Sequence, residues 1–125
     1  MDMMFSDMEK IAVKAHYFME RTKVIQGNIA NADTPLYKPK ELVFKTILQE
    51  NIKLKKTDPK HISPEYKEKY EMKVVDDGYV YGYDGNKVNL EHELAKLAES
   101  SIMYKTLMEL MKKESAKFSY VITGR

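Results

Sequence analysis

The chain has 125 residues, of which 43% are hydrophobic and 32% charged, and it contains no cysteine. A single domain has this size, and the lack of cysteine excludes disulfides, thiolate nucleophiles and cysteine-ligated zinc. Lysine and arginine number 21 against 19 acidic residues, so the formal charge of +2 gives no electrostatic reason to expect nucleic-acid binding. No apolar run can span a bilayer, and the acidic start lacks the apolar core of a Sec signal peptide. We therefore expect no membrane insertion and no cleaved signal.

The first 32 residues carry a heptad stripe that is typical of a long helix. Apolar residues recur at alternating steps of four and three over Met4–Ala32, with Thr22 as the polar exception. The helix should stop before Pro35, because the residue preceding a proline is disfavoured in the helical conformation. The predicted seam of this helix contains Met8, Ile11, Phe18 and Ile25.

A second heptad stripe begins after Asn89 and runs toward the C-terminus. Asn89 is a favourable N-cap, and Glu91 and Glu93 place negative charge on the first turn, where the helix dipole favours it. Two long terminal helices of this kind predict a mainly α fold built on an antiparallel coiled-coil hairpin. The predicted seam of the second helix contains Leu90, Leu94, Leu97, Tyr104, Met108, Met111 and Phe118.

The segment between the two helices is expected to form a small mixed insert. Helical spacing of apolar residues over Glu41–Asn51 predicts a short helix, and two prolines in Thr57–Lys69 indicate an exposed loop. β-Branched and aromatic residues around Asp77-Gly78 predict a β-hairpin over Glu71–Tyr83. One structural unit is therefore divided into an N-terminal helix and turn (1–36), an insert (37–88) and a C-terminal helix (89–125).

Candidate catalytic and metal-binding residues are sparse. His92-Glu93 opens like the zinc-protease pattern H-E-x-x-H, but Lys96 stands where the second histidine is needed. Ser100-Ser101 lacks the glycine-flanked elbow of a hydrolase nucleophile, and there is no phosphate-cradling glycine loop. We therefore predict no catalytic residue, no bound metal, no cofactor and no enzymatic activity.

The two predicted helices carry more apolar residues than a hairpin can bury. Met103, Leu107 and Leu110 widen the second stripe, and similar residues flank the first. A polar insert of this size is too small to cover both, and each Å² of apolar surface left in water forgoes about 25 cal/mol. The pattern therefore indicates association with partner subunits.

The segment Gly27–Lys38 joins the end of the first helix to a turn fixed by Pro35. Its small residues let a neighbouring backbone approach. The side-chain amides of Asn28 and Asn31 can bond the main chain across an interface or cap the orphan carbonyls at the end of the helix.

The run Asn-Ile-Ala-Asn-Ala-Asp-Thr-Pro-x-Tyr-Lys within this segment resembles the N-terminal signature of the bacterial flagellar axial proteins. The short chain, the small insert and the run Asp84–Glu99 together resemble the flagellar basal-body rod protein family, in particular its proximal members. The family usually has glycine where this chain has Leu36. Without glycine, either the turn stays in an ordinary backbone region or Leu36 carries strain of about 1–2 kcal/mol. The matching signature positions are Asn28, Ile29, Ala30, Asn31, Thr34, Pro35 and Tyr37.

The resemblance implies a structural subunit of the periplasmic rod of the flagellar basal body. Such a subunit is exported through the flagellar type III apparatus without a cleaved signal peptide. Its terminal helices then form a coiled-coil layer with copies of itself and with other rod and basal-body proteins.

The residues alone also allow two functions of other classes. A soluble adaptor or export chaperone would use the helical hairpin to hold a partner helix, and it would be a stable helical monomer or dimer. A nucleic-acid binder would use Tyr79, Tyr81 and Tyr83 as a stacking surface, although cross-strand packing is the simpler explanation for these tyrosines.

Overall fold

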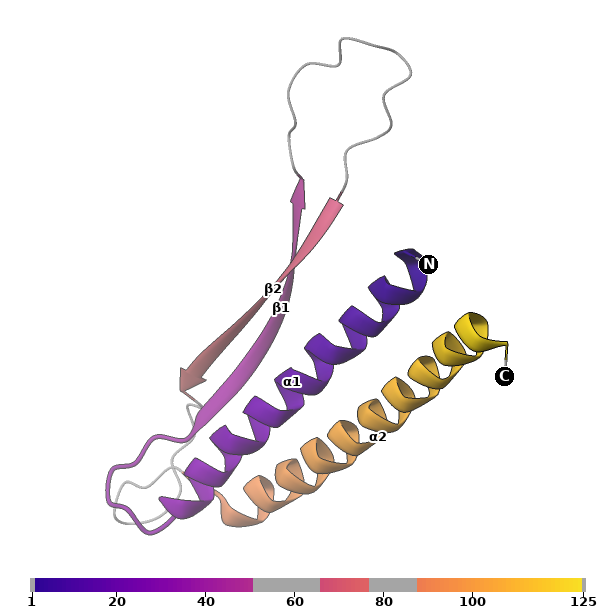
Figure 1. Ribbon diagram of the computed structural model, residues 1–125. Helices are drawn as coiled ribbons and strands as arrows, with labels where there is room; N and C mark the ends of the chain where they lie inside the picture. The colour runs from indigo at the N-terminus through magenta and orange to yellow at the C-terminus, as the bar shows by residue number, and fades with distance from the viewer. Residues whose placement is uncertain (1, 51–65, 77–87, 125) are drawn as a thin grey trace.

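The computed structural model describes residues 2–50, 66–76 and 88–124, in which two long helices accompany a two-stranded sheet (Figure 1). Helix α1 spans Asp2–Ala30 and helix α2 spans Leu90–Thr123. The helices run antiparallel, side by side, and the sheet packs on α1 (Figure 1). The predicted fold class, a mainly α helical hairpin with a small insert, is confirmed.

Helix α1 shields its predicted seam partly from solvent and ends in a tight turn. Ile25 is buried, and Met8, Ile11 and Phe18 are half-buried. At 1.5 Å per residue the helix is about 43 Å long. Beyond Ala30 the main-chain hydrogen bonds span three residues instead of four. The Thr34 N–H donates to the Asn31 carbonyl, and the Tyr37 N–H donates to the Thr34 carbonyl. The chain therefore leaves the helix before the proline.

Helix α2 is capped at both ends. Asn89 is the predicted N-cap, and its Oδ1 accepts the His92 N–H at 3.2 Å. At the other end Gly124 has a φ of 67° and donates its N–H to the Tyr120 carbonyl at 2.8 Å. Glycine adopts this left-handed conformation without a Cβ clash, so it closes the helix at no steric cost.

The insert contains a strand where the sequence suggested a helix. Strand β1 spans Lys40–Glu50 and pairs antiparallel with β2, which spans Tyr66–Asp76. The prediction of a short helix over Glu41–Asn51 is therefore wrong, because pairing with a distant strand overrides a weak local helical pattern. The prediction of an exposed loop over Thr57–Lys69 is wrong from Tyr66 onward for the same reason.

Of the predicted hairpin over Glu71–Tyr83, the structure describes only residues 71–76, which are a strand as expected. Residues 71–76 form the end of β2, which pairs with β1. The turn at Asp77-Gly78 and the three alternating tyrosines that follow it lie outside the described residues.

Aromatic side chains attach the sheet to α1. The ring of Tyr17 on α1 lies 5.1 Å from that of Phe44 on β1, and Phe44 stacks on Tyr70 of β2 at 5.4 Å between centroids. The Tyr17 hydroxyl also donates to the Leu42 carbonyl at 3.1 Å. Burial raises the pKa of the Tyr17 hydroxyl above 10.0, although the positive charge of Arg21 opposes the rise.

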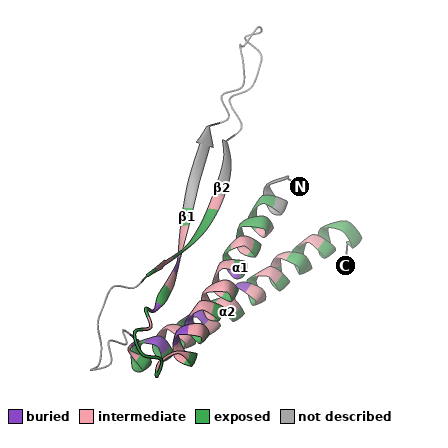
Figure 2. Cartoon of the chain, turned by 90° about the vertical axis from the view of Figure 1, so that its left-hand side faces the viewer, coloured by how far each residue is buried: buried purple, intermediate pink, exposed green. Residues whose placement is uncertain are grey.

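Buried residues gather toward the end of the helix pair at which α1 finishes and α2 begins (Figure 2). Alongside the apolar core, this region buries polar side chains that the next section describes. Of the helices in the described part of the chain, neither is long and apolar enough to cross a membrane. The buried apolar residues are Ala15, Ile25, Leu42, Val88 and Leu107.

Candidate functional site

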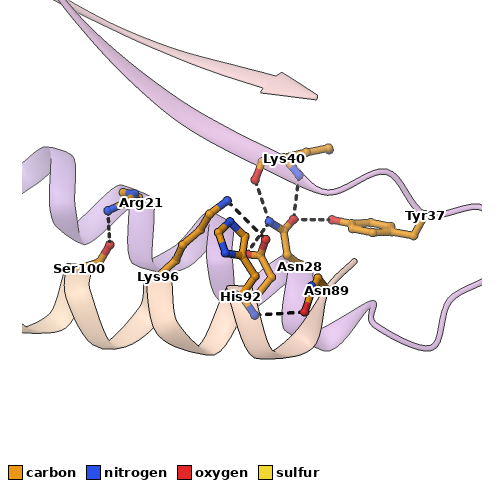
Figure 3. A network of polar contacts seen from close by, with 9 residues as sticks. Arg21, Asn28, Tyr37, Lys40, Asn89, His92, Lys96 and Ser100 are labelled. Atoms are coloured by element: carbon orange, nitrogen blue, oxygen red, sulfur yellow. Dashed lines mark hydrogen bonds and ion pairs between the residues drawn. The ribbon is translucent and has the colours of Figure 1, made fainter. Parts of the chain in front are cut away.

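Asn28 lies where α1, α2 and β1 meet, and only 1% of its surface is exposed. Its Nδ2 donates to the Lys40 carbonyl at 2.7 Å and to Glu93 Oε2 at 3.1 Å. Its Oδ1 accepts the Lys40 N–H at 2.9 Å and the Tyr37 hydroxyl at 3.5 Å (Figure 3). The amide therefore uses both of its donors and both of its acceptor sites. By bonding the N–H and the carbonyl of one residue, it holds the start of β1 against α1.

Glu93 brings a negative charge into the same buried region, with 2% of its surface exposed. Besides its bond to Asn28, its Oε1 lies 3.7 Å from Lys96 Nζ on the same helix. A buried carboxylate needs such partners, because removing a lone charge from water costs several kcal/mol. We call the residues Asn28, Tyr37, Lys40, Glu93 and Lys96 the Asn28 cluster.

A second polar contact lies one heptad away on both helices. Arg21 Nη1 donates to Ser100 Oγ at 3.1 Å and lies 3.7 Å from Glu99 Oε1. Ser100 is completely buried. Arg21 stands seven residues before Asn28 and Ser100 seven after Glu93, as one continuous antiparallel register requires (Figure 3). The two contacts therefore specify the same alignment of the helices.

The two amides of the signature bond groups of their own chain, and Asn31 has the capping role expected from the sequence. Asn31 Nδ2 donates to the Gly27 carbonyl at 2.8 Å and so caps one of the last carbonyls of α1. Asn31 Oδ1 accepts the Thr34 hydroxyl at 3.1 Å, which braces the turn. Asn28 bonds the main chain, as described above.

The remaining signature positions lie around this turn at different depths. Ile29 is half-buried, whereas Ala30 and Pro35 are exposed. Tyr37 is half-buried and is the signature residue whose hydroxyl reaches Asn28. The signature thus combines residues that hold the turn with residues at the surface.

Leu36 takes the strained alternative of the two considered for its position. Its φ is 60°, and among the described residues no other non-glycine has a positive φ. This conformation costs an L-residue about 1–2 kcal/mol, and a glycine would adopt it freely. The Leu36 side chain is 76% exposed, so burial does not offset that strain.

Helix α2 presents to α1 only part of the stripe predicted from its sequence. Leu90 and Leu94 are 46% and 49% exposed. A row formed by Glu93, Ser100 and Leu107 is buried instead. The predicted seam residues that are half-buried on α2 are Leu97, Tyr104, Met108, Met111 and Phe118.

Sequence reasoning missed this row because two of its members are polar. In the sequence, Glu93 has the position of a favourable first-turn charge, and Ser100 lies in a serine pair that lacks the context of a nucleophile. Their partners Asn28 and Arg21 lie on the other helix, so no local pattern marks them as buried. The available signal was the spacing of polar residues, seven apart on each helix.

The residues considered as metal ligands or nucleophiles have structural contacts in the described part of the chain. His92 takes part in the N-cap through its main-chain N–H. Within the described ranges, no three residues of the types that bind metals are grouped so as to hold an ion. The buried polar groups here bond one another and hold helices and strand together.

Several large apolar side chains of α2 remain exposed in the single chain. At 100° per residue, Leu90 and Leu94 lie on one side of the row that faces α1, and Met103, Leu110 and Val121 lie on the other. These residues are Leu90, Leu94, Ile102, Met103, Leu110, Tyr120, Val121 and Ile122.

Known proteins resemble this chain over most of its length, although no family model matches it. The flagellar basal body rod protein FlgB of Aquifex aeolicus is 34% identical over 110 residues, covering 88% of this chain and 87% of the relative. FlgB of Bacillus subtilis is 36% identical over 107 residues, or 83% of each chain. This chain belongs to the FlgB family of flagellar basal-body rod proteins.

FlgB of Buchnera aphidicola extends the comparison, with 33% identity over 113 residues and 84% of this chain covered. The FlgB relatives confirm the family that the signature around Asn28 indicated. Their matches are too long to rest on the signature turn alone, so the shared sequence includes much of the two helices or the insert.

Proposed function

We propose that this FlgB-family chain is a structural subunit of the flagellar basal-body rod. It assembles through α1 and α2 into a helical tube, with copies of itself and with other rod and basal-body proteins. It reaches the periplasmic rod through the flagellar type III export apparatus without a cleaved signal peptide. Its work is mechanical, so the proposal includes no catalysis, cofactor, metal ion, nucleic acid or membrane insertion.

The observation that supports assembly is the apolar surface left exposed along α2. Met103 directly precedes the half-buried Tyr104, whereas Leu94 directly follows Glu93 of the buried row. One step in either direction along a helix turns by about 100°, so these two residues lie on opposite flanks of the seam. Both are exposed. A single partner helix on one flank would leave the other flank in water.

An array of subunits can cover both flanks of α2. Leu110 lies seven residues from Met103 and therefore shares its flank. Burial of such side chains stabilises an interface by about 25 cal/mol per Å². Repeated copies around and along a tube provide neighbours on both sides, which favours the helical array.

Leu110→Asp tests the proposal. Leu110 is exposed in the single chain, so the substitution should leave folding intact while placing a carboxylate in the subunit interface. We expect the variant to be expressed at the normal level but to be absent from purified basal bodies, and its cells not to swim. The measurement is complementation of a bacterial strain that lacks its own copy, followed by isolation of basal bodies.

Lys113→Asp is the matched control, because it adds the same carboxylate on the same helix at an exposed charged position. We expect it to support swimming. Normal swimming and normal incorporation of the Leu110→Asp variant would contradict assembly through the flanks of α2.

A further inference from the structure

The apolar face of the sheet is covered on one strand and open on the other. Leu42 of β1 pairs with Val74 of β2, and residues paired in this way share a face. On the same face, Phe44 pairs with Met72. Leu42 is only 6% exposed, whereas Val74 is 49% and Met72 36% exposed. Helix α1 therefore shields this face over β1 and leaves it in water over β2. We call Met72 and Val74 the β2 face.

The other side of β2 is charged. Glu71 and Lys73 alternate with the apolar residues, so their side chains lie on the opposite face, and both are exposed. That side suits water, whereas the β2 face suits packing. A two-stranded antiparallel sheet is marginally stable by itself and needs a helix or further strands against its apolar side. Over β2, that requirement is not met by the contacts described within one chain.

The second helix of the same chain is on the wrong side to provide the cover. The sheet packs on α1 through β1, and α2 lies on the far side of α1 (Figure 1). The order across the molecule is therefore α2, α1, β1 and β2, as the view from the side also shows (Figure 2). Helices form layers over the apolar faces of sheets, and α1 already occupies the part over β1. The space over β2 suits a second helix, which must come from another molecule.

A rod subunit carries helices of the kind that this space requires. In this chain, Leu94 and Met103 remain exposed on the flanks of α2 after the two helices have paired. Such a flank and the β2 face lie on opposite sides of one subunit. Contact between two unlike surfaces does not close into a dimer and instead continues from one subunit to the next. This is the type of contact that a helical array needs.

We infer that the β2 face is a docking surface for a terminal amphipathic helix of the adjacent rod subunit. The helix lies beside α1 and turns its exposed apolar flank toward Met72 and Val74. The inference rests on the proposed function, because the contact forms in the assembled rod. It assigns the insert a part in assembly, in addition to the part proposed for α2.

Cysteine protection in isolated basal bodies tests whether the β2 face is covered. The chain has no cysteine, so Val74→Cys supplies a single small, weakly polar thiol on this face. Met72→Cys repeats the measurement at a second position. Lys73→Cys is the matched control, because it stands between them on the charged side of the strand. We expect a maleimide reagent to label all three variants after denaturation, but in intact basal bodies to label the Lys73→Cys variant alone.

A photoreactive side chain identifies the molecule that covers the face. Met72→p-benzoylphenylalanine places a benzophenone there, and irradiation of basal bodies joins it to its neighbour. We expect a product heavier than the single chain, in which mass spectrometry finds a peptide from a terminal helix of a rod subunit. A peptide from a strand, a loop or a protein outside the rod would overturn the inference, and so would joining within one chain only.

The failure of the inference can be distinguished from the failure of the proposed function. If the chain is present in basal bodies but Val74→Cys and Met72→Cys are labelled as fast as Lys73→Cys, the inference is overturned and the proposed function stands. Protection of all three positions would also overturn it, since the covered surface would not be one face of β2. Absence of the wild-type chain from basal bodies would contradict the proposed function, and the inference with it.

Discussion

The two ends of the helix pair are built differently. At the closed end, where α1 finishes and α2 begins, Asn28 and Glu93 are buried and hydrogen-bonded to each other. Toward the open end, which holds the N-terminus of α1 and the C-terminus of α2, no described residue before Ala15 or after Leu107 is buried in the helices (Figure 2). The closed end combines exposed apolar residues with buried polar contacts that define the geometry of the chain, whereas the open end has exposed apolar side chains and no buried residue in the described part of the helices.

The difference between the two ends shows that polar and apolar contacts have separate roles along one coiled coil. An apolar heptad stripe can be aligned in several registers, because each step of seven residues presents a similar surface. Buried polar groups accept only the alignment in which they find their partners. The contacts of Asn28 and Arg21 supply that specificity at the closed end, and the exposed stripe beyond them remains adaptable.

The largest effect is expected from a charge placed at the closed end. Ile25 is buried, so Ile25→Asp would lose apolar burial and leave a carboxylate without a partner, at a cost of about 3–5 kcal/mol of unfolding free energy. Ile122→Asp makes the same change at the exposed open end and should cost less than about 0.5 kcal/mol. Urea denaturation followed by circular dichroism measures both, and equal losses would contradict the contrast between the two ends.

A smaller effect is expected from Tyr17, which attaches the sheet to the middle of α1. Tyr17→Phe removes the hydrogen bond to the Leu42 carbonyl and should cost about 0.5–1.5 kcal/mol near neutral pH. The difference in unfolding free energy between wild type and Tyr17→Phe should decrease at alkaline pH. Burial raises the pKa of Tyr17 in the folded chain, so the unfolded chain ionises first and wild-type stability falls as the pH rises past 10.0 and through the raised value.

The measurement is denaturation of wild type and Tyr17→Phe at increasing pH. Tyr120→Phe is the control, because Tyr120 is exposed at the open end. If wild type and the Tyr17→Phe variant lose stability in parallel above this pH, the environment assigned to the Tyr17 hydroxyl is incorrect.

The smallest effect is a gain at the signature turn. Leu36→Gly relieves the cost of a left-handed L-residue, less the extra freedom that glycine has in the unfolded chain, so it should stabilise the fold by about 0.5–1 kcal/mol. Leu36→Ala keeps the Cβ and should give no such gain. Thermal denaturation distinguishes the two, and an equal response to glycine and alanine would show that strain at this position is unimportant.

Much of the helical part could be predicted from the sequence, because its signals are local. The heptad periodicity marks both helices, and Asn89 occupies the N-cap that its residue type favours. The capping role of Asn31 followed from a side-chain amide near the last carbonyls of a helix. The family followed from a run of consecutive residues, which is also a local signal.

The remaining features depend on partners far away in the chain. Strand β1 exists because it pairs with β2, and its own spacing of apolar residues favours a helix. Glu93 can be buried because Asn28, 65 residues earlier, donates a hydrogen bond to its carboxylate. The backbone conformation of Leu36 could not be predicted either, since a leucine does not indicate a positive φ. In each case the deciding contact is absent from the local sequence.

The attachment of β1 to α1 also protects the sheet against strand addition. Residues 40 and 42 of an antiparallel strand direct their main-chain groups to the same edge. On that edge Asn28 occupies both polar groups of Lys40, and the Tyr17 hydroxyl occupies the carbonyl of Leu42. Unpaired edges of this kind recruit strands from other chains and lead to aggregation. Side chains of a helix thus close this stretch of the edge of β1 to strand addition.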